Sequence, residues 1–129
     1  MRFMDYWDGE VNLIEKWYEI QDDSVKAAFD VTLKEILGTR DLGTSTQLVR
    51  CVRQHLGLWE VRFEVIQDRR KRHFRPVGFW NYGGEEFVLV NGCEKSGRVT
   101  IPAGIFDNAL DIHCQFFNEG RGTINEHDI

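Results

Sequence analysis

The stretch RFEVIQDRRKRHFR, from Arg62 to Arg75, gathers cationic side chains between two segments that read as β-strands. From Leu58 to Val65 polar and apolar residues alternate, which is the pattern of a strand with one buried face. Phe74–Trp80 reads as a second strand, weakened by Pro76, which has no backbone N–H for a ladder hydrogen bond. Residues Asp68–Arg72 are predicted to form the turn. The stretch therefore predicts an antiparallel hairpin with a cationic end.

Outward from this hairpin, the pattern predicts helices on both sides along the chain. A short strand at 1–6 precedes a helix that begins near Asp8, and a better helix runs from Asp22 or Asp23 to Gly38. After a turn at 81–84, residues 85–91 (EEFVLVN) read as a third strand. A loop at 92–100 leads to a last helix that Gly120 ends. We expect an α+β domain over residues 1–120 and a flexible tail at 121–129.

Charge is unevenly distributed along the chain. From Arg50 to Arg75 there are eight Lys or Arg residues against three acids, whereas the segments before and after each carry five more acids than bases. The net charge is −5. A basic segment within an acidic chain predicts a surface that binds phosphates, and a second surface for a basic partner.

The rest of the composition predicts a cytoplasmic protein. No apolar run approaches the ~20 residues of a membrane helix, and the N-terminus does not resemble a secretion signal. The three cysteines are odd in number and widely spaced, which favours reduced thiols. The four histidines lack metal-ligand spacing, so we predict no metal and no cofactor. His113, on the apolar side of the last helix, is expected to be a hydrogen-bonded core histidine.

Three motifs in order resemble those of the RelE/HigB-type toxins of type II toxin–antitoxin systems, in particular the phage-derived HigB-like branch of the RelE/ParE superfamily. They are GLWEVRF at 57–63, Phe74-Arg75 at the next strand, and VLVNGCEK at 88–95 before an Ile-Pro helix start. Here Phe74 stands where the family has tyrosine, and Lys95-Ser96 where it has two lysines. The resemblance covers about residues 56–117.

The resemblance implies a RelE-like (microbial ribonuclease-like) fold with two N-terminal helices, an antiparallel sheet of three to four strands and a C-terminal helix. It also implies ribosome-dependent endonucleolytic cleavage of messenger RNA, and neutralisation by a HigA-like helix-turn-helix antitoxin. Carried onto this chain, the family's functional residues become Arg62, Arg75 and Lys95.

Metal-free RNA cleavage requires a base for the 2′-OH, cations at the phosphate and an acid for the leaving oxygen. We expect Arg62 and Arg75 to hold the scissile phosphate, with Lys95 as a second electrostatic group. His73 is the nearby side chain that titrates near neutral pH, so it is the candidate general base or acid. The flanking phosphates would be bound by four further cations, Arg69, Arg70, Lys71 and Arg72.

Each of these residues also has a plain structural interpretation. Arg62 could pair only with Glu60 or Glu64, the Arg69–Arg72 run could be a solvated turn, and Lys95 and His73 could be ordinary surface residues.

Two further functions stay open. The chain could be a non-catalytic interaction protein on a related scaffold, either directed at DNA gyrase or a degenerate phage protein that binds an antitoxin. Alternatively, it could bind a basic partner through an acidic face of the N-terminal helices, formed by Asp22, Asp23, Asp30 and Glu35.

Overall fold

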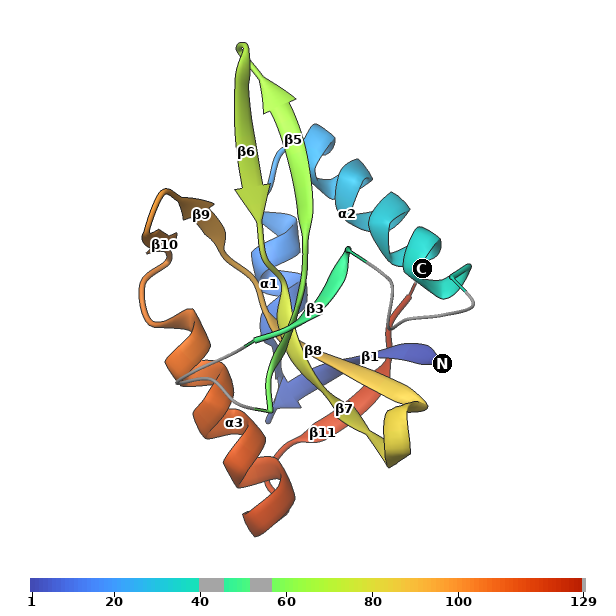
Figure 1. Cartoon of the computed structure of the whole chain (residues 1–129). Coiled ribbons are helices and arrows are strands. Elements are labelled where there is room, and N and C mark those ends of the chain that lie inside the picture. Colours follow the sequence, from blue (N-terminus) through green and yellow to red (C-terminus); the bar gives the residue numbers. More distant parts are fainter. Residues whose placement is uncertain (40–45, 52–56, 129) are drawn as a thin grey trace.

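The computed structural model describes residues 1–39, 46–51 and 57–128. Within these ranges the chain forms three α-helices and eleven strands, and the strands make one seven-stranded and one four-stranded sheet (Figure 1). In chain order the elements are β1 (Arg2–Asp8), β2 (Val11–Asn12), α1 (Leu13–Glu19), α2 (Asp23–Leu37), β3 (Leu48–Arg50), β4 (Trp59–Val61), β5 (Phe63–Gln67), β6 (Arg70–Phe74), β7 (Val77–Asn81), a 3₁₀ turn (Tyr82–Gly84), β8 (Glu86–Asn91), β9 (Glu94–Ser96), β10 (Val99–Ile101), α3 (Ile105–Glu119) and β11 (Thr123–Glu126).

The larger sheet lies between α1 and α2 on one face and α3 on the other. Its strand order is β11-β1-β8-β7-β4-β3, with β2 paired to β1, and β1 runs parallel to β8. Strand β8 shows why both faces are covered, because its apolar residues alternate between two cores. Phe87 and Leu89 pack with the first helices, while Val88 and Val90 pack with α3. A continuous apolar run is the pattern of a strand buried on both faces.

The smaller sheet has the order β10-β9-β6-β5, and its β5–β6 hairpin projects beyond the body of the molecule (Figure 1). Asp68 and Arg69 form the two-residue turn, with positive φ angles of 51° and 62°. Such a turn matches the twist of the paired strands. We call β5, this turn and β6 the cationic hairpin. It is fixed near the N-terminus of α2, where the Gln67 amide donates to the Asp22 carboxylate at 3.0 Å.

Helix α2 forms as its sequence pattern predicts, but the predicted starts of the other two helices are wrong: α1 begins at Leu13, capped by Asn12, because Asp8 belongs to β1, and α3 begins at Ile105, because residues 99–101 form β10. The Asp22 carboxylate accepts the backbone N–H of Val25 at 3.0 Å and caps α2, whose apolar residues form one buried stripe. In α3, His113 packs against Phe79 with ring centroids 5.0 Å apart. Its Nδ1 atom is buried without a hydrogen-bond partner among the described residues. The hydrogen bond expected for this core histidine is thus missing at Nδ1 within the described part of the chain, and burial lowers the pKa of His113.

The α+β class is confirmed, but the predicted arrangement of three to four antiparallel strands between two helices and one helix is wrong. The described residues hold many more strands, in two sheets, and the pairing of β1 with β8 is parallel. The strand expected at 58–65 divides at Arg62 into β4 and β5, which belong to different sheets. Pro76 similarly separates β6 from β7. At each of these two breaks the chain leaves one sheet and enters the other.

Two segments expected to lack regular structure contain strands. The predicted loop at 92–100 holds β9 and most of a hairpin with β10, in which Thr100 pairs with Lys95. The segment 121–129, expected to be a flexible tail, contains β11, which pairs with β1 at the edge of the larger sheet. The two ends of the chain therefore lie side by side (Figure 1). In the described ranges, no helix has the length and apolar character that crossing a membrane requires.

Candidate functional site

The strand register brings the four residues proposed for catalysis to one face of the smaller sheet. In the β5–β6 ladder Glu64 lies opposite His73 and the last pair is Phe63 with Phe74, so Arg62 and Arg75 are the residues that follow directly after the end of this ladder. On the other side of β6, His73 lies opposite Lys95 of β9. Because side chains two residues apart share a face, these cations gather on a single surface.

Arg75 is held at the junction of the two sheets by its backbone. Its N–H donates to the carbonyl of Cys93 at 2.8 Å, and its own carbonyl accepts from the Cys93 N–H at 3.2 Å. The Arg75 side chain is 14% exposed, and its Nη1 atom donates to the Phe74 carbonyl at 2.8 Å. Burial lowers the pKa of Arg75. This guanidinium is thus fixed and partly dehydrated, the state in which a cation acts most strongly on a bound anion.

The carboxylate of Glu60 lies between the two arginines. Its Oε1 atom accepts the Nε–H of Arg62 at 2.7 Å and lies 3.8 Å from Nε of Arg75. The Glu60 side chain is only 9% exposed, whereas that of Arg62 is 45% exposed. We call Glu60, Arg62 and Arg75 the Glu60 cluster. It combines one buried carboxylate with two cations, of which Arg75 is largely covered and Arg62 is open to solvent.

Sequence reasoning treated Glu60 only as a structural partner of Arg62 and did not propose it as a functional residue. A signal was present, since Glu60 stands two residues before Arg62 and therefore has the same strand parity. The alternating pattern instead predicted that this side chain faces solvent, but the residue is 7% exposed.

His73 and Lys71 extend the same face toward the tip of the cationic hairpin. The Nδ1 atom of His73 lies 3.3 Å from Oε1 of Glu64, and the Lys71 ammonium lies 3.4 Å from Oε2 of the same carboxylate. Lys95 lies at the rim of the site, with its ammonium 5.7 Å from the ring centroid of Phe106. His73 and Lys95 are cross-strand partners and adjoin the Glu60 cluster.

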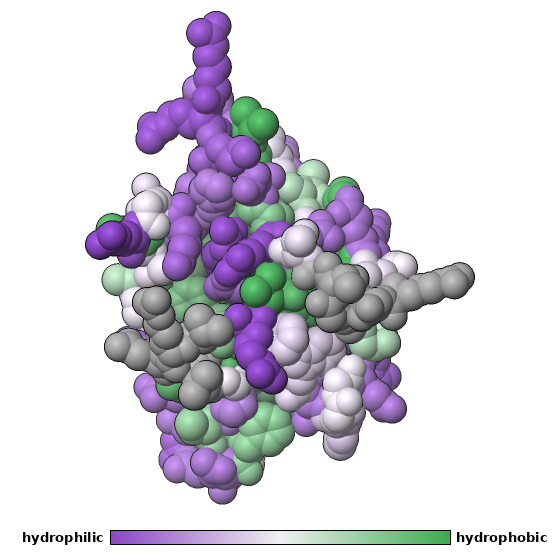
Figure 2. Space-filling view, in the orientation of Figure 1, coloured by the Kyte–Doolittle hydropathy of each residue, from purple (hydrophilic) through white to green (hydrophobic). Residues whose placement is uncertain are grey.

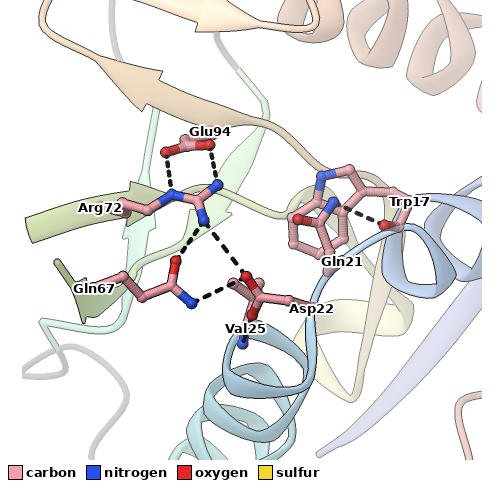
Figure 3. Close-up of polar contacts among 7 residues, drawn as sticks. All are labelled: Trp17, Gln21, Asp22, Val25, Gln67, Arg72 and Glu94. Atoms are coloured by element: carbon pink, nitrogen blue, oxygen red, sulfur yellow. Dashed lines mark hydrogen bonds and ion pairs between the residues drawn. The ribbon is translucent and has the colours of Figure 1, made fainter.

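Arg72 points to the other face, toward α2 (Figure 3). Its guanidinium donates two hydrogen bonds to Glu94, at 2.7 and 2.8 Å, and a third to the side-chain carbonyl of Gln67 at 2.6 Å. It also lies 3.6 Å from the Asp22 carboxylate. The hydrogen bond with Glu94 raises the pKa of Arg72, and the pKa of Glu94 is lowered for the same reason. Arg72 thus fixes the hairpin to α2 and does not join the other proposed RNA-binding residues.

The cationic surface is therefore smaller than the run of basic residues suggests. Arg69 and Arg70, at the tip, and Lys71 are exposed. In Figure 2 hydrophilic side chains extend from the projecting hairpin down the middle of the visible face. Of the acids considered for a basic partner, Asp22 caps α2 and Asp30 accepts the Tyr18 hydroxyl at 2.7 Å.

Two hollows lie beside the Glu60 cluster, and Arg62 lines both. The α3-side hollow, of about 350 Å³, is lined by Arg50, Cys51, Glu60, Arg62, Lys95, Thr100, Gly104, Phe106 and Asp107. The α2-side hollow, of about 580 Å³, is lined by Thr32, Thr46, Gln47, Arg62, Phe63, Glu64 and Arg75. An extended polyanion that crosses Arg62 would therefore meet one hollow on each side.

Two cysteine thiols adjoin the Glu60 cluster, but their pKa values are too high for them to act as nucleophiles. Burial raises the pKa of Cys51 to about 12 and that of Cys93 to about 11, so both are protonated at neutral pH. The Cys51 thiol lies 3.9 Å from Oε2 of Glu60, as a weak donor. Among the described parts of the chain, no group of three or more His, Cys, Asp or Glu side chains could hold a metal ion.

No family model matches the chain, and searches of curated proteins and of solved structures found no significant match.

Proposed function

We propose that this protein is a RelE/HigB-type toxin of a toxin–antitoxin system, which cleaves messenger RNA on the ribosome without a metal ion. The observation that carries the proposal is the Glu60 cluster, in which Oε1 of Glu60 lies 2.7 Å from Nε of Arg62 and 3.8 Å from Nε of Arg75. A phosphodiester needs both kinds of group, because one must take a proton while the others stabilise the negative charge.

The reaction divides among the residues of this face. The Glu60 carboxylate takes the proton of the 2′-OH, and the 2′-oxygen attacks the adjacent phosphorus. Arg62 and Arg75 stabilise the pentavalent phosphorane through charge-assisted hydrogen bonds. The bond from phosphorus to the 5′-oxygen then breaks, and that oxygen takes a proton from His73 or Lys95. The products are a 2′,3′-cyclic phosphate and a 5′-hydroxyl end.

The exposed cations of the hairpin bind the flanking phosphates of messenger or ribosomal RNA. Arg69, Arg70 and Lys71 are suited to this role because they are exposed and belong to the hairpin that projects beyond the body of the molecule (Figure 1). Binding through phosphates releases counterions, so the affinity falls as the salt concentration rises.

The same proposal names the partner and the place of action. Such a toxin is neutralised by a cognate helix-turn-helix antitoxin of the HigA kind, and its substrate requires that it act in the cytoplasm. The acidic segments outside residues 50–75 provide a surface of opposite charge for a basic segment of the antitoxin.

Expression without the antitoxin tests this proposal. The wild-type chain should arrest growth and cut messenger RNA on translating ribosomes, whereas the double variant Arg62→Ala/Arg75→Ala should do neither. Arg121→Ala is the matched control, because Arg121 pairs with Glu119 at the exposed end of α3, away from the site. Intact messenger RNA in the presence of purified wild-type protein would overturn the enzymatic proposal.

A second candidate is a non-catalytic interaction protein. The observation that favours it is that Glu60 already neutralises one of its two arginines, in a chain with a net charge of −5. Inhibited DNA gyrase together with intact messenger RNA would support a gyrase-directed toxin. A protein that binds an antitoxin and is not toxic would support a degenerate copy.

A further inference from the structure

A third hollow lies near the opposite edge of the larger sheet from the Glu60 cluster, where the first two helices meet the paired ends of the chain. We call it the His127 hollow. It has a volume of about 470 Å³ and is lined by side chains of β1, α1, α2 and the C-terminal segment, among them Asp5, Trp7, Asn12, Asp30 and His127. Strands β8 and β7 separate β1 from β4, which carries Glu60. The hollow is therefore distinct from the proposed nuclease site.

The imidazole ring of His127 is held in one orientation by buried neighbours. Its Nδ1 atom lies 2.7 Å from Oδ1 of Asp5, and the Asn12 amide donates to the other oxygen of that carboxylate at 2.9 Å. The ring also meets Phe29 edge-on, with ring centroids 5.9 Å apart. Because an ionised carboxylate only accepts, Nδ1 carries the hydrogen and Nε2 is the acceptor of the neutral ring. Nε2 has no hydrogen-bond partner among the described residues and is not buried, so it can accept from a ligand.

A flat side chain and a second fixed acceptor complete the walls of the hollow. Trp7 is half-buried and makes no contact with another aromatic ring in the described part of the chain. The Tyr18 hydroxyl donates to Oδ2 of Asp30 at 2.7 Å, which fixes this carboxylate and leaves its Oδ1 without a partner in the ranges that the structure describes. The hollow thus offers an indole face and two oriented acceptors, one on His127 and one on Asp30.

The charge of the hollow favours a cation. Three more carboxylates line it, those of the exposed residues Glu15, Glu126 and Asp128, whereas Lys34 contributes the single lysine or arginine side chain among its described lining residues. A cation bound among them is attracted by several negative charges at once.

We propose that the His127 hollow is a binding site for a guanidinium group, carried either by a small organic cation or by an arginine side chain of a partner protein. A guanidinium has a positive charge, five N–H donors in one plane and two flat faces. The acceptors of His127 and Asp30 match its donors, and the Trp7 indole matches a flat face. An ammonium has the charge but no flat face to stack. This inference goes beyond the proposed nuclease function and does not depend on it.

Calorimetric titration of the purified protein with four compounds tests the class of ligand. Agmatine is a free guanidinium cation, and N-acetyl-arginine methylamide presents the same group as it occurs in a peptide. The citrulline counterpart replaces the guanidinium with a neutral urea of the same shape, and the lysine counterpart carries an ammonium. We expect the citrulline compound to bind at least roughly tenfold more weakly than the arginine compound, and the lysine compound to bind more weakly as well.

Two substitutions remove one acceptor each and keep the contacts that hold it. Asp30→Asn removes the charge but retains an oxygen for the Tyr18 hydroxyl. His127→Asn retains an N–H donor at the place of Nδ1, facing Asp5, but has no counterpart of Nε2. For each variant we expect roughly a tenfold loss of affinity for the arginine compound.

A matched pair of exposed residues on α1 provides the control. Glu15→Gln removes a carboxylate that lines the hollow, whereas Glu19→Gln makes the same change outside it. We expect roughly a threefold loss of affinity for Glu15→Gln and no change for Glu19→Gln. If thermal unfolding shows that His127→Asn or Asp30→Asn does not fold, the comparison of Glu15→Gln with Glu19→Gln decides the result.

The outcomes also separate the two sources of the group. Tighter binding of agmatine than of the arginine compound supports a free small cation, and the reverse order supports a side chain of a partner. The proposal is overturned if neither guanidinium compound binds at up to about 1 mM. Equal affinities for the arginine compound and its citrulline or lysine counterpart would overturn it too, as would wild-type affinity in all three variants of the hollow.

Discussion

Replacing Glu60 with glutamine tests the assignment of roles within the Glu60 cluster. The substitution keeps the size of the side chain and an acceptor oxygen, but removes the charge that takes the 2′-OH proton. Loss of a general base costs about 10²–10⁴ in rate. We expect the loss in kcat, while KM stays constant or falls, because a negative charge has been removed from beside the phosphate site.

The expected loss of stability of Glu60→Gln follows from how exposed its two arginine partners are. Arg75 is 14% exposed and would lose its nearby carboxylate, whereas Arg62 is 45% exposed and can be rehydrated. Breaking a fully buried ion pair costs ~3–5 kcal/mol, and one half-exposed partner reduces this to ~1–3 kcal/mol. For a chain of this length, each kcal/mol corresponds to about 4 °C in Tm.

Glu64→Gln is the matched control, since it makes the same change on the same face. The Glu64 side chain is 47% exposed, so we expect a stability change within ~0.5 kcal/mol and less than a tenfold loss of rate. Single-turnover cleavage on programmed ribosomes and urea unfolding give the two numbers for each variant. Equal rate losses for the two variants, or a Glu60→Gln protein with the wild-type rate, would refute the role of Glu60 as the base.

Three further predictions concern the fold, and unfolding in urea checks each of them. Arg72→Ala should lose ~1–2 kcal/mol through its contacts with α2 and β9, whereas the exposed Arg70→Ala should stay within ~0.5 kcal/mol. Gly78→Ala should lose ~3 kcal/mol or more, because a Cβ would lie 1.9 Å from a backbone oxygen of β8; Gly38→Ala, whose nearest atoms are 3.6 Å away, should lose less than ~1 kcal/mol. Since the folded-state pKa of His113 is lowered, its protonation in the unfolded state removes stability as the pH falls through about 6.5, and His113→Leu should reduce that loss.

Opposite outcomes would contradict these readings of the structure. Equal effects of the two arginine substitutions would mean that the contact with α2 contributes nothing. A stable Gly78→Ala protein would contradict the close approach of β7 to β8. An unchanged pH dependence in His113→Leu would show that the unpaired ring nitrogen does not matter.

The parts of the fold with a strong local signal could be predicted from the sequence. Helix α2 is an example, because the Asp22 cap, a continuous apolar stripe and Gly38 agree, and the helix runs over Asp23–Leu37. The cap residues and the spacing of the apolar residues all lie within the helix and its two flanking positions. The helical period of the sequence is therefore sufficient to predict α2.

The strands that were missed have no such local signal. β9, β10 and β11 have three or four residues each; β9 and β11 lack an apolar alternation, and that of β10 (Val99-Thr100-Ile101) is too short to predict a strand. They form because a partner strand is already in place, as where Thr123–Glu126 pairs with β1. Tertiary pairing of this kind is not encoded in the segment itself.

The candidate site could be predicted only in part, because it too depends on tertiary structure. The strand alternation of residues 71, 73 and 75 places Lys71, His73 and Arg75 on one face. The sequence instead predicts a turn at Asp68–Arg72, and a turn does not separate Arg72 from the other RNA-binding candidates. Glu60 was missed because its burial depends on a junction between two sheets, and only the fold could reveal that junction.

The central claim is that the Glu60 cluster cuts RNA by attack of the 2′-oxygen, and the chemical ends of the product test it most directly. Messenger RNA would be incubated with translating ribosomes and wild-type protein, then recovered, and the new ends identified; a control adds EDTA to the protein before dilution into the reaction. We expect 2′,3′-cyclic phosphate and 5′-hydroxyl ends, unaffected by the EDTA treatment and absent with Arg62→Ala/Arg75→Ala. A 5′-phosphate end, or cutting that persists in the double variant, would contradict it.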